Sequence, residues 1–388
     1  MTEEIYTKDS LLELAHLAVN YATSKGVQAA EAFFHSNRRL QILAEGQSIA
    51  NERDVFEIGF GIRVIKEESE GFSYTNKIDK KDLEICAEDA IGIASVAPKK
   101  EGLRFPFASD YPTIEGLYSP QISAIETEEM VTKMKEILAP IKEAKSNVNA
   151  NLSNIAIEED WYGIVNSLGV EAFRKSNEHS GVFFAAARDG DKIGSFIIHD
   201  FYTRNPSSID FAKFGEEVVE LAERNLNTIV LDSIDSDIAI FKKGAIFFPL
   251  GIVISSAVGA HNVQQNRSMW KDKLADTVAV DTFNFIDDPH NLERGGGVKT
   301  FDDEGNATQK NTIIQNGILE NFLFDELRAS RVNAVSTGNS SRGFGGLKFT
   351  NPPSNIMPNA PTILPGDMSE KEMIEDTKMG IIFDRFSG

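Results

Sequence analysis

The sequence predicts an α+β fold, in which an N-terminal mixed helix and strand domain precedes a mainly antiparallel β domain. Helical and strand patterns alternate over the first 230 residues, whereas strand and turn signals dominate from about Asp237 onward. The length of 388 residues suits two domains of ordinary size. We therefore predict two domains, 1–230 and 231–388, with a boundary near 228–235.

The N-terminal domain is expected to begin with a helix and to contain three more. Ser10 and Glu13 have the spacing of a capping box, and apolar residues at helical spacing continue until Gly26. Cys86, beside the apolar face of the second helix, is interpreted as a buried small side chain rather than a reactive thiol. The three further helices are expected at about 81–96, 126–145 and 209–226.

Strand patterns lie between these helices. The clearest alternation of apolar and other residues is Ile58, Phe60, Ile62 and Val64. Asp189-Gly190 is a hairpin signal that leads into a strand over 192–202. The other strands of this domain are expected at 30–35, 40–44, 149–157 and 181–187.

In the C-terminal domain, turn residues separate short strands. Asn316-Gly317 supplies the two positive φ angles of a type I′ turn between 308–315 and 318–325. The acidic run 302–306 is interpreted as a solvated hairpin turn, because it lacks the glycine and glutamate positions of an EF-hand. We interpret the apolar residues before His261 as a strand, with short helices near 257–265 and 369–378.

Charge and composition exclude several classes of function. The 39 Lys and Arg against 59 Asp and Glu give a net charge of −20, which argues against an extended nucleic-acid-binding surface. No apolar run approaches the roughly 20 residues that cross a bilayer, and the acidic N-terminus lacks the features of a signal peptide. One cysteine excludes an internal disulfide. We expect a cytoplasmic protein that binds neither membrane nor nucleic acid.

Few residues indicate chemistry by themselves. The six histidines are dispersed, so a local zinc motif of the HExxH type is not encoded. The glycine-rich segment 338–346 contains Asn339 and Arg342, which could bind a carboxylate or a peptide backbone, but it lacks the lysine of a phosphate loop. From the residues alone, the function of the two-domain protein stays unspecified.

An ordered series of motifs in residues 257–346 resembles the TldD/PmbA family, the so-called modulators of DNA gyrase. The series begins with Gly259-Ala-His-Asn262 and ends with Ser336-Thr-Gly-Asn339. Between them lie Arg267-Ser268, Lys273-Leu274, Ile286-Asp-Asp-Pro289, Phe301-Asp-Asp-Glu-Gly305, Thr308-Gln309 and Asn316-Gly-Ile-Leu319. The N-terminal half is compatible with the same family, and the resemblance implies proteolysis.

The TldD branch of this family resembles zinc peptidases, with a His-Glu-x-x-x-His helix and a later cysteine. When the shared Ala-Val-Gly is aligned, the three positions of that motif hold Ser255, Ser256 and Ala260. These side chains offer no imidazole or carboxylate to zinc. His261 lies one residue further, about 100° round a helix, and the cysteine would lie beyond Gly388. The resemblance therefore implies no catalytic residue and no metal in this chain.

A missing metal motif is the pattern of the PmbA branch, also called TldE. The resemblance implies a partner subunit in a metallopeptidase complex that acts on unfolded or small peptides, with zinc in the TldD-type subunit. Its implied cavity-lining polar residues are His261, Arg267, Asn339 and Arg342.

Two alternative functions stay open: a self-sufficient metallopeptidase or hydrolase with an unrecognised site, and a non-proteolytic regulator of DNA gyrase. A homo-oligomer is a further option for its assembly. Family members continue with more strands, so the C-terminal domain is expected to be truncated.

Overall fold

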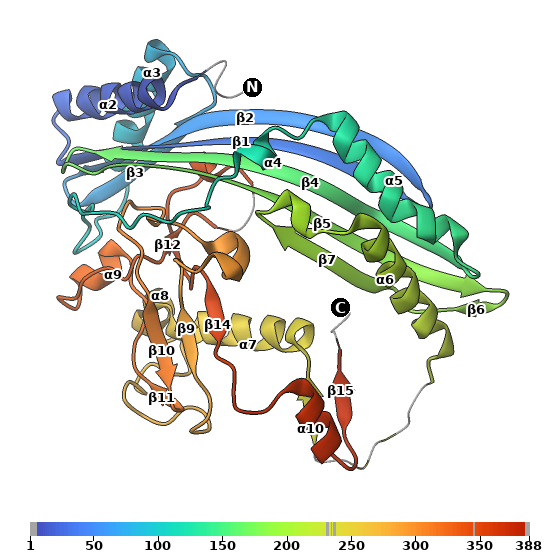
Figure 1. Ribbon diagram of the computed structural model, residues 1–388. Coiled ribbons are helices and arrows are strands. Elements are labelled where there is room, and N and C mark those ends of the chain that lie inside the picture. Colours follow the sequence, from blue (N-terminus) through green and yellow to red (C-terminus); the bar gives the residue numbers. More distant parts are fainter. Residues whose placement is uncertain (1–5, 230–232, 234, 236–237, 344–345, 385–388) are drawn as a thin grey trace.

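A computed structural model describes residues 6–229, 233, 235, 238–343 and 346–384. Its main feature is a long curved sheet of seven strands within residues 29–203, which arches over the C-terminal part of the chain (Figure 1). Neighbouring strands are antiparallel in the order β3-β2-β1-β4-β5-β6, and β7 also pairs with β5. The strands are β1 (Ala29–Glu45), β2 (Ser48–Lys66), β3 (Ser69–Thr75), β4 (Asn147–Asn166), β5 (Glu171–Asp189), β6 (Lys192–Ile193) and β7 (Ile197–Thr203).

Helices cover the convex face of this sheet (Figure 1). One core cluster packs α2 and α3 against the strands, and a second packs α5 and α6 against them. The predicted strand over 58–64 is confirmed as part of β2, and Phe60, Ile62 and Val64 are fully buried in the first cluster. The helices of this part are α2 (Lys8–Ser24), α3 (Lys80–Ala94), α4 (Pro120–Ser123), α5 (Thr127–Glu143) and α6 (Phe211–Arg224), with the 3₁₀ turns η1 (Pro206–Ser208) and η2 (Asn225–Asn227).

The C-terminal part lies under the concave face and is built from short elements (Figure 1). A four-stranded sheet in the order β11-β10-β9-β14 forms its centre, and the chain has the predicted α+β fold. The strands are β8 (Ala239–Phe241), β9 (Phe285–Asp287), β10 (Asn311–Gln315), β11 (Ile318–Leu319), β12 (Ser340–Ser341), β13 (Asn355–Ile356), β14 (Pro361–Ile363) and β15 (Ile381–Phe383). The helices are α7 (Lys243–Val258), α8 (Ala260–Gln264), α9 (Glu326–Ser330) and α10 (Glu370–Asp376), with η3 (Leu292–Gly297) and η4 (Lys348–Thr350).

Two predicted turns form as expected, while the first helix begins earlier than predicted. Asn316 and Gly317 have φ angles of 49° and 76° between β10 and β11, as a type I′ turn requires. The Asp189-Gly190 hairpin joins β5 to β6. The N-terminal capping box, however, joins Thr7 to Ser10 rather than Ser10 to Glu13, because the backbone amide of each bonds the other's hydroxyl.

The predicted strand before His261 is wrong, because this segment forms the helix α7. The run is apolar on all sides and contains Pro249, so it offers no helical stripe to recognise. Its 16 residues nevertheless exceed the usual length of a buried strand and favour a helix. None of the described helices is both long and apolar enough to span a bilayer.

The interpretation of the acidic run 302–306 as a solvated turn is also wrong. Asp302, Asp303 and Glu304 are each at most 3% exposed. Asp302 accepts hydrogen bonds from the backbone amides of Glu304 and Asn306, at 3.0 and 2.9 Å, so it holds the turn from inside. Burial raises the pKa of Asp302 to about 7.

The predicted domain boundary near 228–235 falls partly on residues outside the described part, so it stays a prediction. The large sheet ends with β7, and α6 follows it on the convex face. The described residues from 238 onward belong to the elements under the concave face (Figure 1). Cys86 is 3% exposed, so its interpretation as a buried small side chain is confirmed, and burial raises its pKa to about 11.

The buried His179 in β5 is expected to lower the free energy of unfolding in acid. Its ring is fully buried against Phe201 and Phe211, and within the described residues neither ring nitrogen has a hydrogen-bond partner. Burial, aided by the positive charge of Lys133, lowers its pKa from 6.5 to about 4. The unfolded chain therefore binds a proton at this residue below about pH 6.5, whereas the folded chain binds it only below about pH 4.

We expect this histidine to remove about 3 kcal/mol of stability as the pH falls from 6.5 to 4. Urea unfolding across that range should show a steeper loss for the wild type than for His179→Leu. Above pH 7 the difference between the two proteins should be constant. Parallel curves for the two proteins between pH 6.5 and 4 would refute the assignment.

Candidate functional site

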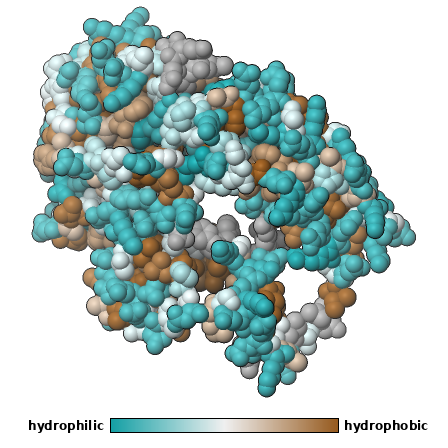
Figure 2. Space-filling model, viewed as in Figure 1, coloured by the Kyte–Doolittle hydropathy of each residue, from teal (hydrophilic) through white to brown (hydrophobic). Residues whose placement is uncertain are grey.

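A cavity of about 720 Å³ lies beside the C-terminal half of α7. Residues of α7 and α8 line one side, and the segment 355–361 lines the other. Ser255, Ser256 and His261 are polar members of the first side, whereas Ala260 is fully buried and does not line the cavity. Figure 2 also shows a hollow between the large sheet and the C-terminal part.

The helix that carries these residues breaks at Gly259. Its φ and ψ of −68° and 121° end α7, and α8 starts at the next residue, whose amide bonds the carbonyl of Leu323 at 2.8 Å. A side chain at Gly259 would meet the ring of His261 at 2.7 Å, so glycine allows the close approach. Ser255 and His261 therefore lie on different helices, whereas Ala260 and His261 are consecutive residues of α8.

The residues at the cavity do not fit a zinc ion. His261 is half-buried, and burial lowers its pKa, with the positive charge of Arg328 adding to the effect. Its Nδ1 lacks a hydrogen-bond partner among the described residues. Ser255 and Ser256 offer only hydroxyl groups, and no cluster of three His, Cys, Asp or Glu able to hold a metal occurs in the described part of the chain.

Of the other predicted cavity residues, Asn339 positions the wall instead of lining it. Its side chain is fully buried and donates to Asp287 at 2.6 Å and to the carbonyl of Met357 at 3.1 Å. Asp287 in turn accepts the amide of Ala360 at 2.6 Å. These bonds fix the segment 355–361 against β9.

Arg342 and Arg267 lie away from the cavity. Arg342 is 2% exposed and donates to Glu31 of the large sheet at 2.7 Å, so it joins the two parts of the chain. Arg267 is exposed in the turn after α8 and is not among the lining residues. The structure thus brings only His261, of the four predicted residues, to the cavity wall.

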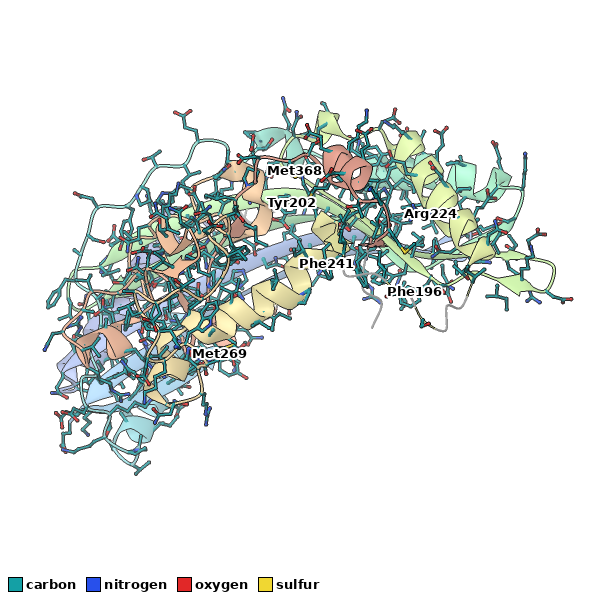
Figure 3. All side chains as sticks on the ribbon, turned by 90° about the horizontal axis from the view of Figure 1, so that it is seen from below. Phe196, Tyr202, Arg224, Phe241, Met269 and Met368 are labelled. Atoms are coloured by element: carbon teal, nitrogen blue, oxygen red, sulfur yellow. The ribbon has the colours of Figure 1, made fainter. Side chains whose placement is uncertain are left out.

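A second, charged cavity of about 340 Å³ adjoins the first under the concave face of the sheet. The two share Gly297 and the segment 357–359. Figure 3 looks at the molecule from below, with α7 crossing the strands and Tyr202 on the sheet. Tyr162, Arg174 and Glu178 line this cavity from alternate positions of β4 and β5. Sequence reasoning missed them, because residues 174–180 are polar at every position and show no alternation that would mark the cavity face.

An aromatic stack forms the roof of the charged cavity. The rings of His35 and Tyr162 are parallel within 4° at 4.4 Å, and the guanidinium of Arg174 lies 3.9 Å from the Tyr162 ring. His35 Nδ1 accepts the amide of Lys348 at 3.0 Å, so its proton is on Nε2, which donates to Asp160 at 2.7 Å. Burial raises the pKa of Tyr162 well above its usual value. Tyr162 therefore stays un-ionised beneath the guanidinium of Arg174.

Comparison with known proteins places this architecture among the PmbA and TldD proteins. A family model described as the PmbA/TldA metallopeptidase C-terminal domain matches residues 239–388, and one described as PmbA/TldA metallopeptidase domain 1 matches residues 30–94. The crystal structure of TldE from Thermococcus kodakarensis superposes with a TM-score of 0.84 at 20% identity, over 98% of this chain and 83% of that one. This likeness concerns the fold.

Two proteins of Haemophilus influenzae represent the two branches. A metalloprotease TldD homolog is 25% identical over 383 residues, which cover 94% of this chain and 76% of that protein. A metalloprotease PmbA homolog is 24% identical over 346 residues, which cover 86% of this chain and 73% of that protein. Because these identities are nearly equal, they do not assign a branch, and the residues at the cavity must decide between the two.

Proposed function

Because this chain belongs to the TldD/PmbA family of metallopeptidases, we propose that it is the PmbA/TldE-type subunit of a proteolytic complex. A TldD-type partner supplies the zinc in this proposal. The observation that supports this proposal concerns the positions of the zinc motif. Ser255 and Ser256 line the cavity where the family's zinc branch has a histidine and a glutamate. A cytoplasmic location belongs to the same proposal.

The role of this subunit is to bind and restrict the peptide. Ile252, Ile356 and Pro361 give the 720 Å³ cavity apolar walls, which suit peptide side chains. The wall segment 355–361 is fixed through Asn339 and Asp287, so the cavity is preformed. Unfolded chains and small peptides reach such a cavity, whereas a folded domain does not.

A cleavage assay tests the proposal. The purified chain, a TldD-type subunit and their mixture are each incubated with an unfolded polypeptide, and the products are followed by mass spectrometry. We expect cleavage by the mixture and none by this chain alone. Cleavage by the chain alone would favour the self-sufficient hydrolase, and a stable complex without cleavage would favour the non-proteolytic regulator.

Filling the cavity should slow cleavage by the complex. Ile252 and Val253 are adjacent in α7 and are 55% and 48% exposed, but only Ile252 lines the cavity. We expect Ile252→Trp to lower kcat/KM by about tenfold or more, because an indole occupies space that the peptide needs. Val253→Trp is the matched control and should retain activity. Equal losses in the two variants would contradict a substrate role for the cavity.

A further inference from the structure

Four basic and three acidic side chains line the charged cavity under the concave face. Its positive side chains are Arg174, Arg204, Lys299 and Lys348, and its carboxylates are Asp160, Glu178 and Asp303. When all seven groups are ionised, one positive charge is in excess. Strands β4 and β5 contribute from above, and the C-terminal part contributes from below.

Each carboxylate of this cavity is already hydrogen-bonded by the protein. Asp160 accepts from His35 at 2.7 Å and from Asn37 at 2.9 Å. Asp303 accepts the amide of Arg342 at 2.7 Å. Glu178 accepts the hydroxyl of Tyr202 at 2.6 Å. Each negative group therefore has a hydrogen bond of its own, in addition to the charge of Arg204 near Glu178 and of Lys299 near Asp303.

Its two arginines, in contrast, have unused donors. The Arg204 side chain is 10% exposed, donates to the carbonyl of Gly295 at 3.3 Å and lies 4.0 Å from Glu178, but its Nε has no partner among the described residues. Arg174 stands between the rings of Tyr162 and Phe301, which hold it at 3.9 and 5.3 Å, and its Nε is likewise unpartnered there. A buried guanidinium nitrogen that lacks a hydrogen-bond acceptor is costly, and an anion in the cavity would relieve that cost.

The two lysines of the charged cavity, Lys299 and Lys348, also favour an anion there. Within the described part of the chain, the Lys299 amine makes neither a hydrogen bond nor an ion pair, and its burial lowers its pKa. The Lys348 amine donates to the carbonyl of Gly343, and burial lowers its pKa as well. Both amines would be stabilised in their charged form by a nearby anion.

We propose that this cavity binds one carboxylate of the peptide, beside the apolar cavity that takes its side chains. The inference rests on the proposed function for the peptide, whereas the carboxylate follows from the charges of the cavity. A single excess positive charge matches a monoanion, and a phosphate dianion would leave the site negative. Because Gly297 and the segment 357–359 line both cavities, one peptide can occupy the two together.

Direct binding to this chain tests the proposal without a partner or zinc. The probe is a fluorescein-labelled apolar heptapeptide with a free terminal carboxylate, compared by fluorescence anisotropy with its amide. We expect the free acid to bind about tenfold or more tightly at low salt, and high salt to reduce this preference. A third probe is the amide with one internal Glu. If it binds as tightly as the free acid, the cavity also accepts a side-chain carboxylate, which would support the same carboxylate recognition.

Two neighbouring residues of β5 provide the matched variants. Arg174 faces the cavity, whereas the amine of Lys175 lies 3.7 Å from the ring of Tyr118 and 3.8 Å from Glu159, on the opposite face. Arg174→Gln should abolish the preference for the free acid, Lys175→Gln should preserve it, and Arg174→Lys should restore part of it.

Three outcomes would overturn the proposal. They are equal binding of acid and amide by the wild type, equal losses in Arg174→Gln and Lys175→Gln, and stronger competition by inorganic phosphate than by acetate. Any of these can occur while the mixed subunits still cleave peptides, so failure here is distinct from failure of the proposed function.

Discussion

Replacing Glu31 with glutamine is expected to lower the free energy of unfolding by about 3–5 kcal/mol. Glu31 is fully buried and its two oxygens bond Arg63 at 2.6 Å and Arg342 at 2.7 Å. Both arginines are 2% exposed, so the amide would leave two buried guanidinium groups short of one negative charge. Urea unfolding at pH 7, followed by circular dichroism, measures this loss.

An exposed carboxylate provides the control for this substitution. Asp54 pairs with Arg38 at 2.8 Å on the surface, with side chains that are 27% and 20% exposed. Because water screens this pair, Asp54→Asn should cost no more than about 1 kcal/mol. If Glu31→Gln cost as little as Asp54→Asn, the buried network would not be what joins the sheet to the C-terminal part.

Gly71→Ala is expected to destabilise the protein by about 3 kcal/mol. A Cβ at this position of β3 would lie 1.9 Å from the carbonyl oxygen of Ala90 and 2.6 Å from the amide nitrogen of Ala94. Both atoms belong to the backbone of α3, so no side chain can turn away, and the helix must move off the sheet. The shift in melting temperature measures the effect.

The same helix supplies a glycine for which the opposite sign is expected. Gly92 in α3 has no atom near the place of a Cβ, so alanine fits there without a clash. Gly92→Ala should raise the free energy of unfolding by about 0.5–1 kcal/mol, because alanine loses less backbone entropy in a helix. Destabilisation by both substitutions would point to a general sensitivity of this region rather than to close packing at Gly71.

Local patterns predicted the regular elements of the fold well. The strand over 58–64 and the Asn316-Gly317 turn depend on neighbouring residues, and both are confirmed. The acidic run 302–306 failed because its burial depends on distant partners: Glu304 bonds Arg63, 241 residues away in the chain. A sequence pattern cannot show such a partner, so a charged segment looks solvated.

Residues that are close in the sequence can be expected to lie together, whereas residues that meet through the packing of the two parts cannot. Ser255, Ser256 and His261 fall within seven residues, and the structure places all three at one cavity. Asp160 and Lys348, in contrast, meet only because the C-terminal part packs under the sheet. The charged cavity could therefore be identified only from the structure.

Zinc content is the most direct test of the central claim that this chain is a subunit without its own metal. Metal analysis after purification with added zinc would be performed on the chain alone, on a TldD-type subunit and on their complex. We expect far less than one zinc ion per molecule in this chain, and about one per TldD-type subunit in the complex. One tightly bound zinc ion per molecule of this chain alone would contradict the account.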